Sequence, residues 1–398
     1  MFERHYVKTI VDRISEANNP LMQVVVGPRQ TGKSTMLGQA LAKVDTEQFF
    51  ISADDAIVPS EEWLQVEWQQ ARNATRSGSR PVVLVVDEIQ KVPHWSLVVK
   101  SLYDADRRND TPVRVVLSGS SSLLLHKGLE DSLMGRFELI HSPHWSYSEC
   151  FQAFGFSFDD YLYYGGYPGA ARFASDDARW ISYIREAIIE PTISQDVLAL
   201  EDIRKPALMR ALFRLGATYS ARELSYTKML GQLQDAGNTV TVAHYLDLLD
   251  KAGMLCGIQK YDAKEVRRRK SSPRFMVYDT SLMTASSGIE KSRYLGEPDL
   301  RGHLVESAVG ARLLARASEE GLGVYWWREG TKEVDFVVSK GFDSLSAIEV
   351  KSGKEKGQSG MADFLSAHPS AKRIVVGGAA SGACGVEEFL KDEVELFY

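Results

Sequence analysis

The first third of the chain contains four short apolar runs, separated by longer stretches of mixed polarity. They cover residues 23–26, 48–52, 82–86 and 113–117. Uninterrupted runs of this length, rich in Val and Ile, are typical of strands buried on both faces of a parallel sheet. A helix of about residues 33–43 follows the first run. We therefore predict an α/β domain over residues 1–150.

The pattern changes after residue 150. Residues 151–204 read as a small helical connector with a turn at 164–169. Residues 205–215 have helical spacing, with Leu208, Leu212 and Leu215 on one face, and short helices are expected at 221–224, 229–235 and 240–252. Thr239 or Thr241 can cap the last of them. Strands at 254–258 and 275–278 follow. Helices followed by a two-stranded hairpin predict a winged helix-turn-helix over 205–290.

The last hundred residues return to an α/β pattern. A helix is expected over 302–310, strands over 324–328, 333–338, 347–351 and 373–378, and a helix over 386–390. In the strand at 347–351 the alternation of period two puts Glu349 and Lys351 on one face, with Ile348 and Val350 on the other. We predict a third domain over 291–398.

Composition narrows the class of protein. The length of 398 residues is too great for one ordinary core, in agreement with several domains. The net charge of −6 does not indicate nucleic acid for the chain as a whole, although a local basic patch remains compatible with it. Cys150, Cys256 and Cys384 have no C-x-x-C spacing, which favours a reducing compartment. Without an apolar signal core or membrane-length segment, we expect a cytoplasmic protein with no membrane partner.

A complete phosphate-binding loop follows the first apolar run. Residues 27–34 read Gly-Pro-Arg-Gln-Thr-Gly-Lys-Ser. The glycines let backbone N–H groups and the start of the next helix point at the β-phosphate, Lys33 reaches the β- and γ-phosphates, and Ser34 places its hydroxyl on Mg²⁺. Thr35 is expected to begin the buried side of the helix. The predicted ligands of ATP and Mg²⁺ are Gly27, Pro28, Arg29, Gln30, Thr31, Gly32, Lys33, Ser34 and Thr35.

The apolar run at 82–86 ends in Asp87 and Glu88. An acidic pair alone is most often a solvated turn. After a buried strand and together with a phosphate loop, it has the chemistry that hydrolysis requires. Asp87 can hold Mg²⁺ through water, and Glu88 can polarise the water that attacks the γ-phosphate.

A basic cluster lies between the two strands of the expected wing. Its cations are Lys264, Arg267, Arg268, Arg269 and Lys270, with Arg274 beside them. Such a tip is commonly a solvated loop, and winged helices also dock proteins. Four consecutive cations on a wing nevertheless favour contact with the phosphates of a nucleic acid.

Charged residues on the expected strands of the last domain suggest a second catalytic site. Asp335 and Glu349 can hold Mg²⁺, and Lys351 can orient an attacking water or stabilise the developing charge. Glu306, from the preceding helix, can add a ligand. An Asp followed at a distance by Glu-x-Lys on a strand resembles the restriction-endonuclease-like fold, although the short motif is common by chance.

The assembly also resembles a known class of ATPase. A strand at 48–52 between the loop strand and the acidic strand, and Glu88 adjacent to Asp87, resemble the additional-strand ATPases, AAA+ proteins in particular. That resemblance implies a polar sensor at Ser118, although serines also suit any surface turn. It implies an arginine near the γ-phosphate of its own or a neighbouring subunit at Arg136, although a Gly-Arg pair is usually only a helix end.

Over nearly its full length the chain resembles the AAA+-like ATPases of bacteria and archaea that carry a carboxy-terminal restriction-endonuclease-like domain of uncharacterised function. The motif Gly165-Gly166-Tyr167-Pro168 belongs to the same resemblance. We therefore expect an α/β protein with an AAA+-type ATPase domain, a helical connector, a winged helix and a restriction-endonuclease-like domain. The resemblance implies a homo-oligomer, with a hexameric ring as one arrangement.

Two classes of function remain open. The first is an ATP-driven protein that acts on duplex or branched DNA by remodelling, translocation or branch processing, with a terminal site that cuts in the presence of Mg²⁺. The second is a regulatory or signalling ATPase whose winged-helix and nuclease-like domains only bind nucleic acid or protein. Intact Glu306, Asp335, Glu349 and Lys351 favour cleavage, whereas the acidic total charge argues against an extensive DNA-binding surface.

Overall fold

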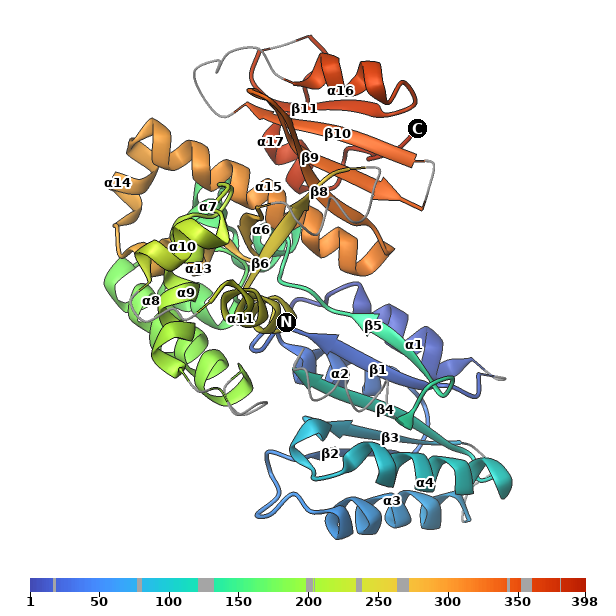
Figure 1. Ribbon diagram of the computed structural model, residues 1–398. Coiled ribbons are helices and arrows are strands. Elements are labelled where there is room, and N and C mark those ends of the chain that lie inside the picture. The colour runs from blue at the N-terminus through green and yellow to red at the C-terminus, as the bar shows by residue number, and fades with distance from the viewer. Residues whose placement is uncertain are drawn as a thin grey trace. The chain divides into compact units, whose positions relative to one another are not determined.

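The chain folds into two compact units, Met1–Ser142 and Pro143–Tyr398. Figure 1 shows the elements of each unit in a computed structural model. The structure describes residues 1–16, 19–76, 81–120, 132–197, 203, 205–233, 238–262, 272–341, 344–351, 360–379 and 381–398. The boundary expected after residue 150 lies within helix α6 (Tyr147–Phe154). The finer division into four domains stays a prediction.

The first unit is built on a parallel five-stranded sheet with the order β2-β3-β4-β1-β5. Its strands are β1 (Met22–Gly27), β2 (Gln48–Ser52), β3 (Val82–Asp87), β4 (Val113–Ser120) and β5 (Phe137–His141). Every residue of β1 and β3 is buried, which explains their uninterrupted apolar sequences. The strand that separates β1 from β3 in space is β4, whereas β2 lies at the edge of the sheet.

Helices cover both faces of this sheet. On one face α1 (Tyr6–Ser15) and α2 (Lys33–Leu41) contribute to a core with Val25, Val85 and Val116. On the other face α3 (Glu61–Thr75), the short helix η1 (Ile89–Lys91) and α4 (Trp95–Arg108) pack against Val24, Leu84 and Leu117. The mixed α/β architecture with a parallel sheet confirms the fold class expected from the sequence.

The second unit contains a helical part and a mixed sheet. Its helices are α6, α7 (Phe158–Tyr164), η2 (Pro168–Phe173), α8 (Asp177–Tyr183), η3 (Ile184–Ile189), η4 (Thr192–Val197), α9 (Pro206–Thr218), α10 (Tyr226–Gln232), α11 (Thr239–Lys251), α13 (Thr280–Ser287), α14 (Lys291–Gly296), α15 (Pro298–Glu320), α16 (Met361–Ala367) and α17 (Val386–Leu390). Among the residues described, none of the helices is long and apolar enough to cross a membrane.

One six-stranded sheet runs through the second unit in the order β11-β10-β9-β8-β6-β7. Its strands are β6 (Leu255–Lys260), β7 (Arg274–Val277), β8 (Gly323–Glu329), β9 (Lys332–Lys340), β10 (Ser344–Lys351) and β11 (Lys372–Gly377). The hairpin of β6 and β7, expected as a wing, joins the other four strands because Gln259 and Lys260 pair in parallel with β8. The expected wing and the expected nuclease-like domain thus share a sheet.

Two local expectations in this unit are wrong. Residues 221–224 do not form a helix: Ala221 has a φ of +63°, and its N–H donates to the carbonyl of Phe275 at 2.8 Å. A left-handed non-glycine residue interrupts a helix, so this segment instead lies along β7. The cap of α11 is Asn238, whose side chain accepts from the N–H of Thr241 at 2.9 Å.

The Gly165-Gly166 turn is shaped by a buried carboxylate. Asp279 caps α13, accepting from the N–H of Ser281 at 2.9 Å, and it also accepts from the N–H of Gly166 at 2.7 Å. A Cβ at Gly165 would lie 1.9 Å from Oδ1 of Asp279, and one at Gly166 would lie 2.3 Å from the carbonyl oxygen of Trp145. Both positions therefore require glycine.

Helix α11 is tied to the end of β7 by a pH-sensitive contact. The hydroxyl of Tyr278 donates to Oδ1 of Asp250 at 2.5 Å. Burial raises the pKa of Asp250 to about 6. A carboxyl with a raised folded-state pKa favours the fold when protonated, so its contribution to stability is lost as the pH rises through about 6.

We therefore predict that Asp250→Asn stabilises the protein at pH 8 by about 1–3 kcal/mol and has little effect near pH 4. Urea unfolding at the two pH values measures the difference. Asp55→Asn, at an exposed position of the first unit, is the control and should change the stability by less than about 0.5 kcal/mol. An equal effect of Asp250→Asn at both pH values would contradict the prediction.

Candidate functional site

The phosphate-binding loop lies between β1 and α2. Steric constraints explain why both Gly27 and Gly32 are glycines. A Cβ at Gly27 would lie 2.0 Å from the carbonyl oxygen of Ser142, the residue that follows β5. Gly32, directly before α2, has a φ of +87°, in the left-handed region that favours glycine. The loop therefore starts against a neighbouring backbone and ends in a turn that frees the first N–H groups of α2.

Lys33 is folded over the loop that precedes it. Its Nζ donates to the carbonyl oxygens of Gly27 at 3.0 Å and Pro28 at 2.8 Å, and only 5% of the residue is exposed. The hydroxyl of Thr31 donates to the same carbonyl of Pro28 at 2.9 Å. The ammonium group is thus held within the loop that the sequence predicts to enclose phosphates. Thr35 is exposed, so the expectation that it begins the buried side of the helix is wrong; after Lys33, the next buried residue of α2 is Met36.

The predicted metal ligands of this site meet directly. The Ser34 hydroxyl donates to Oδ2 of Asp87 at 2.5 Å, and the Asp87 side chain is buried at the carboxyl end of β3. A hydroxyl and a carboxylate are the hard oxygen ligands that Mg²⁺ takes beside phosphate oxygens and water. The residues present therefore fit a magnesium ion bound with a nucleotide.

Glu88 has an unusual backbone. Its φ is +50°, and its N–H donates to Oδ1 of Asp87 at 3.1 Å. Left-handed non-glycine residues are concentrated at functional sites, where the surrounding structure imposes the conformation. The amide of Gln90 donates to the Glu88 carboxylate, a contact that the sequence did not predict. Because the left-handed turn brings residue 90 back toward residue 88, sequence spacing alone gave no signal for it.

Ser118 lies one strand away from the loop. It is on β4 beside Val25 of β1, and its side chain is completely buried. Its hydroxyl has no hydrogen-bond partner among the described residues. The surface-turn alternative is therefore wrong, since a fully buried hydroxyl is not a surface residue. The role as sensor stays a prediction.

Arg136 lies at the end of the sheet where β1 begins, opposite the end that carries the phosphate loop. Its carbonyl oxygen accepts from the N–H of Met22, the first residue of β1, whereas the phosphate loop follows the last. The length of β1 separates the two ends by about 16 Å. The guanidinium is bidentate to Asp104 at 2.8 and 3.0 Å. A role at the phosphates of its own subunit does not agree with this placement, and a role in a neighbouring subunit stays a prediction.

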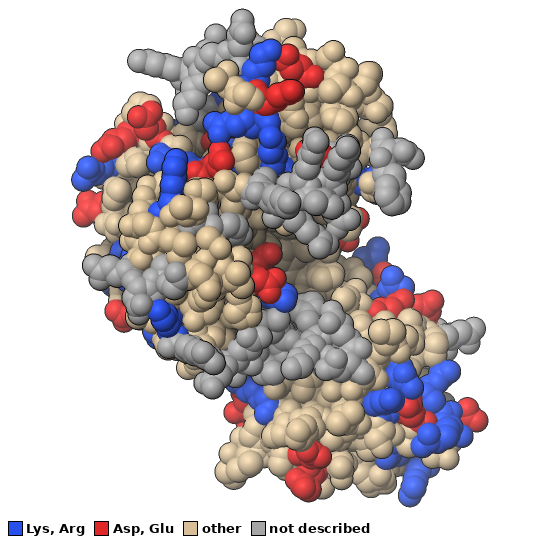
Figure 2. All heavy atoms as spheres, in the orientation of Figure 1, with Lys and Arg blue, Asp and Glu red and all other residues tan. Residues whose placement is uncertain are grey.

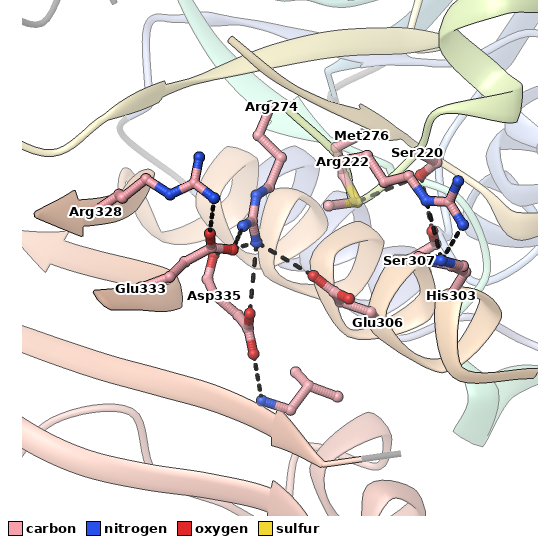
Figure 3. Close-up of polar contacts among 11 residues, drawn as sticks. Ser220, Arg222, Arg274, Met276, His303, Glu306, Ser307, Arg328, Glu333 and Asp335 are labelled. Atoms are coloured by element: carbon pink, nitrogen blue, oxygen red, sulfur yellow. Dashed lines mark hydrogen bonds and ion pairs between the residues drawn. The ribbon is translucent and has the colours of Figure 1, made fainter. Parts of the chain in front are cut away.

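A second cluster of charged residues lies in the mixed sheet (Figure 3). The guanidinium of Arg274, from β7, is 3.2 Å from Oε1 of Glu306 on α15 and 3.6 Å from Oδ1 of Asp335 on β9. It also forms an ion pair with Glu333, two residues before Asp335 and on the same face of the strand. Glu333 is not among the residues predicted from the sequence, although its spacing of two from Asp335 on a strand was a possible signal.

This placement corrects the expectation for Arg274. The side chain is only 4% exposed and lies over the ring of Trp326, 5.3 Å from its centroid, so it does not face a nucleic acid. Its position next to the basic run suggested a residue of the wing tip. Arg274 is instead the first residue of β7 and therefore lies in the sheet. Lys264, Arg267, Arg268, Arg269 and Lys270 lie outside the described residues.

The structure places the predicted metal ligands Asp335 and Glu349 on neighbouring strands, where each already has partners. Oδ2 of Asp335 accepts from the N–H of Val350 at 2.8 Å, and Glu349 is paired with Lys351. Burial raises the pKa of Asp335, against the opposing effect of Arg274. Within the described ranges, no three His, Cys, Asp or Glu side chains are placed to hold a metal ion together.

Comparisons with known proteins match three stretches of the chain. Residues 19–151 match the family model described as an AAA domain, and residues 155–293 and 301–383 match two domains of unknown function, DUF8612 and DUF4143. The first unit thus has an AAA-type P-loop fold.

Relatives in curated collections cover most of the chain. An uncharacterized protein of Haemophilus influenzae is 21% identical over 351 residues, which are 83% of this chain and 82% of the relative. One of Mycobacterium tuberculosis is 28% identical over 319 residues, 79% of this chain and 67% of the relative. Among solved structures, that of the Aeropyrum pernix ORC1 protein in complex with DNA aligns at 13% identity and a TM-score of 0.34, covering 72% of this chain and 93% of that one.

The contact between Gly27 and Ser142 yields a prediction. Gly27→Ala should destabilise the protein by about 2 kcal/mol or more, because the new Cβ meets a backbone carbonyl that cannot move alone. Urea unfolding measures the loss. Gly38→Ala, in the same loop-helix segment but with nothing within 4 Å of the new Cβ, is the matched control and should stabilise α2 by about 1 kcal/mol. Equal effects of the two substitutions would contradict the steric account.

Proposed function

We propose that this protein hydrolyses ATP with Mg²⁺ and uses the reaction to act on DNA. The observation that carries the ATPase proposal is the 2.5 Å contact between the Ser34 hydroxyl and Asp87, at the carboxyl edge of the sheet that also carries Lys33 and Glu88. Phosphoryl transfer requires groups that bind the phosphates, hold the metal ion and activate water. Residues of all three types thus lie at the carboxyl ends of the strands of one sheet.

Each residue of the site has a separate role in hydrolysis. Lys33 exchanges its contacts with the loop carbonyls for the β- and γ-phosphates, and backbone N–H groups at the start of α2 bind the β-phosphate. Ser34, and Asp87 through water, would hold Mg²⁺, and the ion would supply positive charge against the negative charge that develops on the phosphates. Glu88 accepts a proton from the attacking water. Its hydrogen bond from Gln90 keeps the carboxylate in one orientation.

The proposal of DNA as partner is supported by the order of elements in the second unit. Helices α9, α10 and α11 precede the hairpin of β6 and β7, as in a winged helix-turn-helix, and the basic run at 264–270 lies between those strands in sequence. Lys and Arg side chains are mixed with Asp and Glu over the face drawn in Figure 2. Binding would therefore depend on the basic run rather than on net charge. Assembly into a homo-oligomer, with Arg136 reaching a neighbour, belongs to this proposal.

A second candidate is an ATPase that regulates or signals, whose terminal sheet binds nucleic acid or protein without cutting. The observation that favours it is the buried Arg274 among Glu306, Glu333 and Asp335. Cleavage by Glu306, Asp335, Glu349 and Lys351 stays a prediction.

The ATPase assignment predicts that two substitutions separate binding from turnover. Lys33→Ala should remove nucleotide binding, whereas Glu88→Gln should leave binding nearly unchanged and reduce turnover by at least about a hundredfold, since only the water-activating group is lost. Fluorescent-nucleotide titration and phosphate release measure the two effects. Lys43→Ala, an exposed cation after α2, is the control for Lys33. Full turnover in Glu88→Gln would show that Glu88 is not the base.

The DNA assignment predicts salt-dependent binding. Duplex or branched DNA should stimulate ATP hydrolysis, and the double substitution Arg268→Glu with Arg269→Glu should weaken binding and lower the dependence of log affinity on log salt by about 2. Fluorescence anisotropy at several salt concentrations provides the measurement. Lys8→Glu, exposed on α1, is the control. If no DNA binds or stimulates, the regulatory candidate replaces this one.

A further inference from the structure

The guanidinium of Arg274 is the central cation of the acidic cluster in the second unit. It is almost completely buried, and three carboxylates from two elements surround it, Glu306 from α15 and Glu333 and Asp335 from β9. One of its nitrogens also donates to the main-chain carbonyl of Asp335 at 3.2 Å. Buried charges persist when they are paired and hydrogen-bonded in this way.

A second guanidinium and a main-chain N–H bind the other carboxylate oxygens of Glu333 and Asp335. The Arg328 guanidinium is 3.1 Å from the second carboxylate oxygen of Glu333, and the N–H of Val350 binds Oδ2 of Asp335. On the adjacent strand Lys351 binds the Glu349 carboxylate. Figure 3 shows Arg274 between Glu306 on one side and Glu333 and Asp335 on the other. A divalent ion would need these same oxygens, so the residues as arranged do not fit the metal that a nuclease-like site implies.

We propose that Arg274 holds the position of a divalent cation in this cluster and keeps metal ions out of it. The guanidinium is larger than a metal ion, and its planar N–H groups hold the carboxylates at hydrogen-bond distance rather than at the shorter metal–oxygen distance. The cluster thus joins β7 to α15 and β9 through an internal cation. Among the described residues the three carboxylates are not placed to share a metal ion while Arg274 lies between them. Removal of that cation would let them move together around a hard divalent ion.

The test is a Mn²⁺ titration of the full chain followed by electron paramagnetic resonance, without nucleotide. All proteins carry Asp87→Asn, which weakens metal binding at the phosphate loop. The parent should bind no Mn²⁺ at the cluster below about 1 mM, whereas Arg274→Met should bind one ion at least about tenfold more tightly. Adding Asp335→Asn to Arg274→Met should remove that gain, which assigns the ion to the cluster.

Two further variants serve as controls. Arg328→Met removes a neighbouring guanidinium that also contacts Glu333 but is 42% exposed, and it should produce no gain. Arg274→Lys keeps a cation and should fold without gaining a metal. Thermal unfolding with and without Mn²⁺ gives a second readout, since the ion should raise the Tm of Arg274→Met and not that of the parent.

Two outcomes would overturn the proposal. One is tight Mn²⁺ binding by the parent that Asp335→Asn removes, which would show that Arg274 does not exclude the metal. The other is a folded Arg274→Met, or its substitute Arg274→Gln if the first does not fold, with no gain in affinity. Neither result bears on ATP hydrolysis, because both report Mn²⁺ binding at the cluster in the second unit, which contains no residue of the phosphate-loop site.

Discussion

The parallel pairing of β1 with β4, and of β4 with β3, decides where the chemistry of the first unit lies. All three strands run in the same direction, so the phosphate loop after β1 and the acidic pair after β3 leave the sheet at one edge. Ser34 and Asp87, 53 positions apart, meet there at 2.5 Å. The same constraint sends Arg136 to the opposite edge, because it precedes its strand instead of following it.

In the second unit the organising element is a shared sheet. The short parallel pairing of β6 with β8 makes the hairpin continuous with the strands that carry Glu333, Asp335 and Glu349. Because Arg274 is the first residue of β7, this pairing places its side chain in the acidic cluster. A hairpin that belonged to a separate domain could be displaced without exposing buried charge. Here a displacement of β7 would strip three carboxylates of their cation, which makes movement of this strand energetically costly.

The sequence was sufficient for features that depend on neighbouring residues. The phosphate loop and the strand ending in Asp87 are local motifs, and most strands were found from their apolar runs. It was insufficient where a remote element decides. Burial of Arg274 depends on α15 and β9, the extended course of residues 221–224 depends on pairing with β7, and the contact between Gln90 and Glu88 depends on a left-handed turn. In the first two cases a tertiary contact overrode the local pattern, and in the third the backbone conformation of Glu88 decided the contact.

The turn at Gly165 and Gly166 has a consequence for how this chain can change over time. The carboxylate of Asp279 fills the volume that a side chain at position 165 would need, and it binds the N–H of Gly166. Substitutions at these residues, which lie more than a hundred positions apart, therefore depend on one another. A larger residue at position 165 needs a smaller residue in place of Asp279, and that replacement uncaps α13, whereas position 166 is blocked by the carbonyl oxygen of Trp145. Related sequences should therefore change these positions together or leave all of them unchanged.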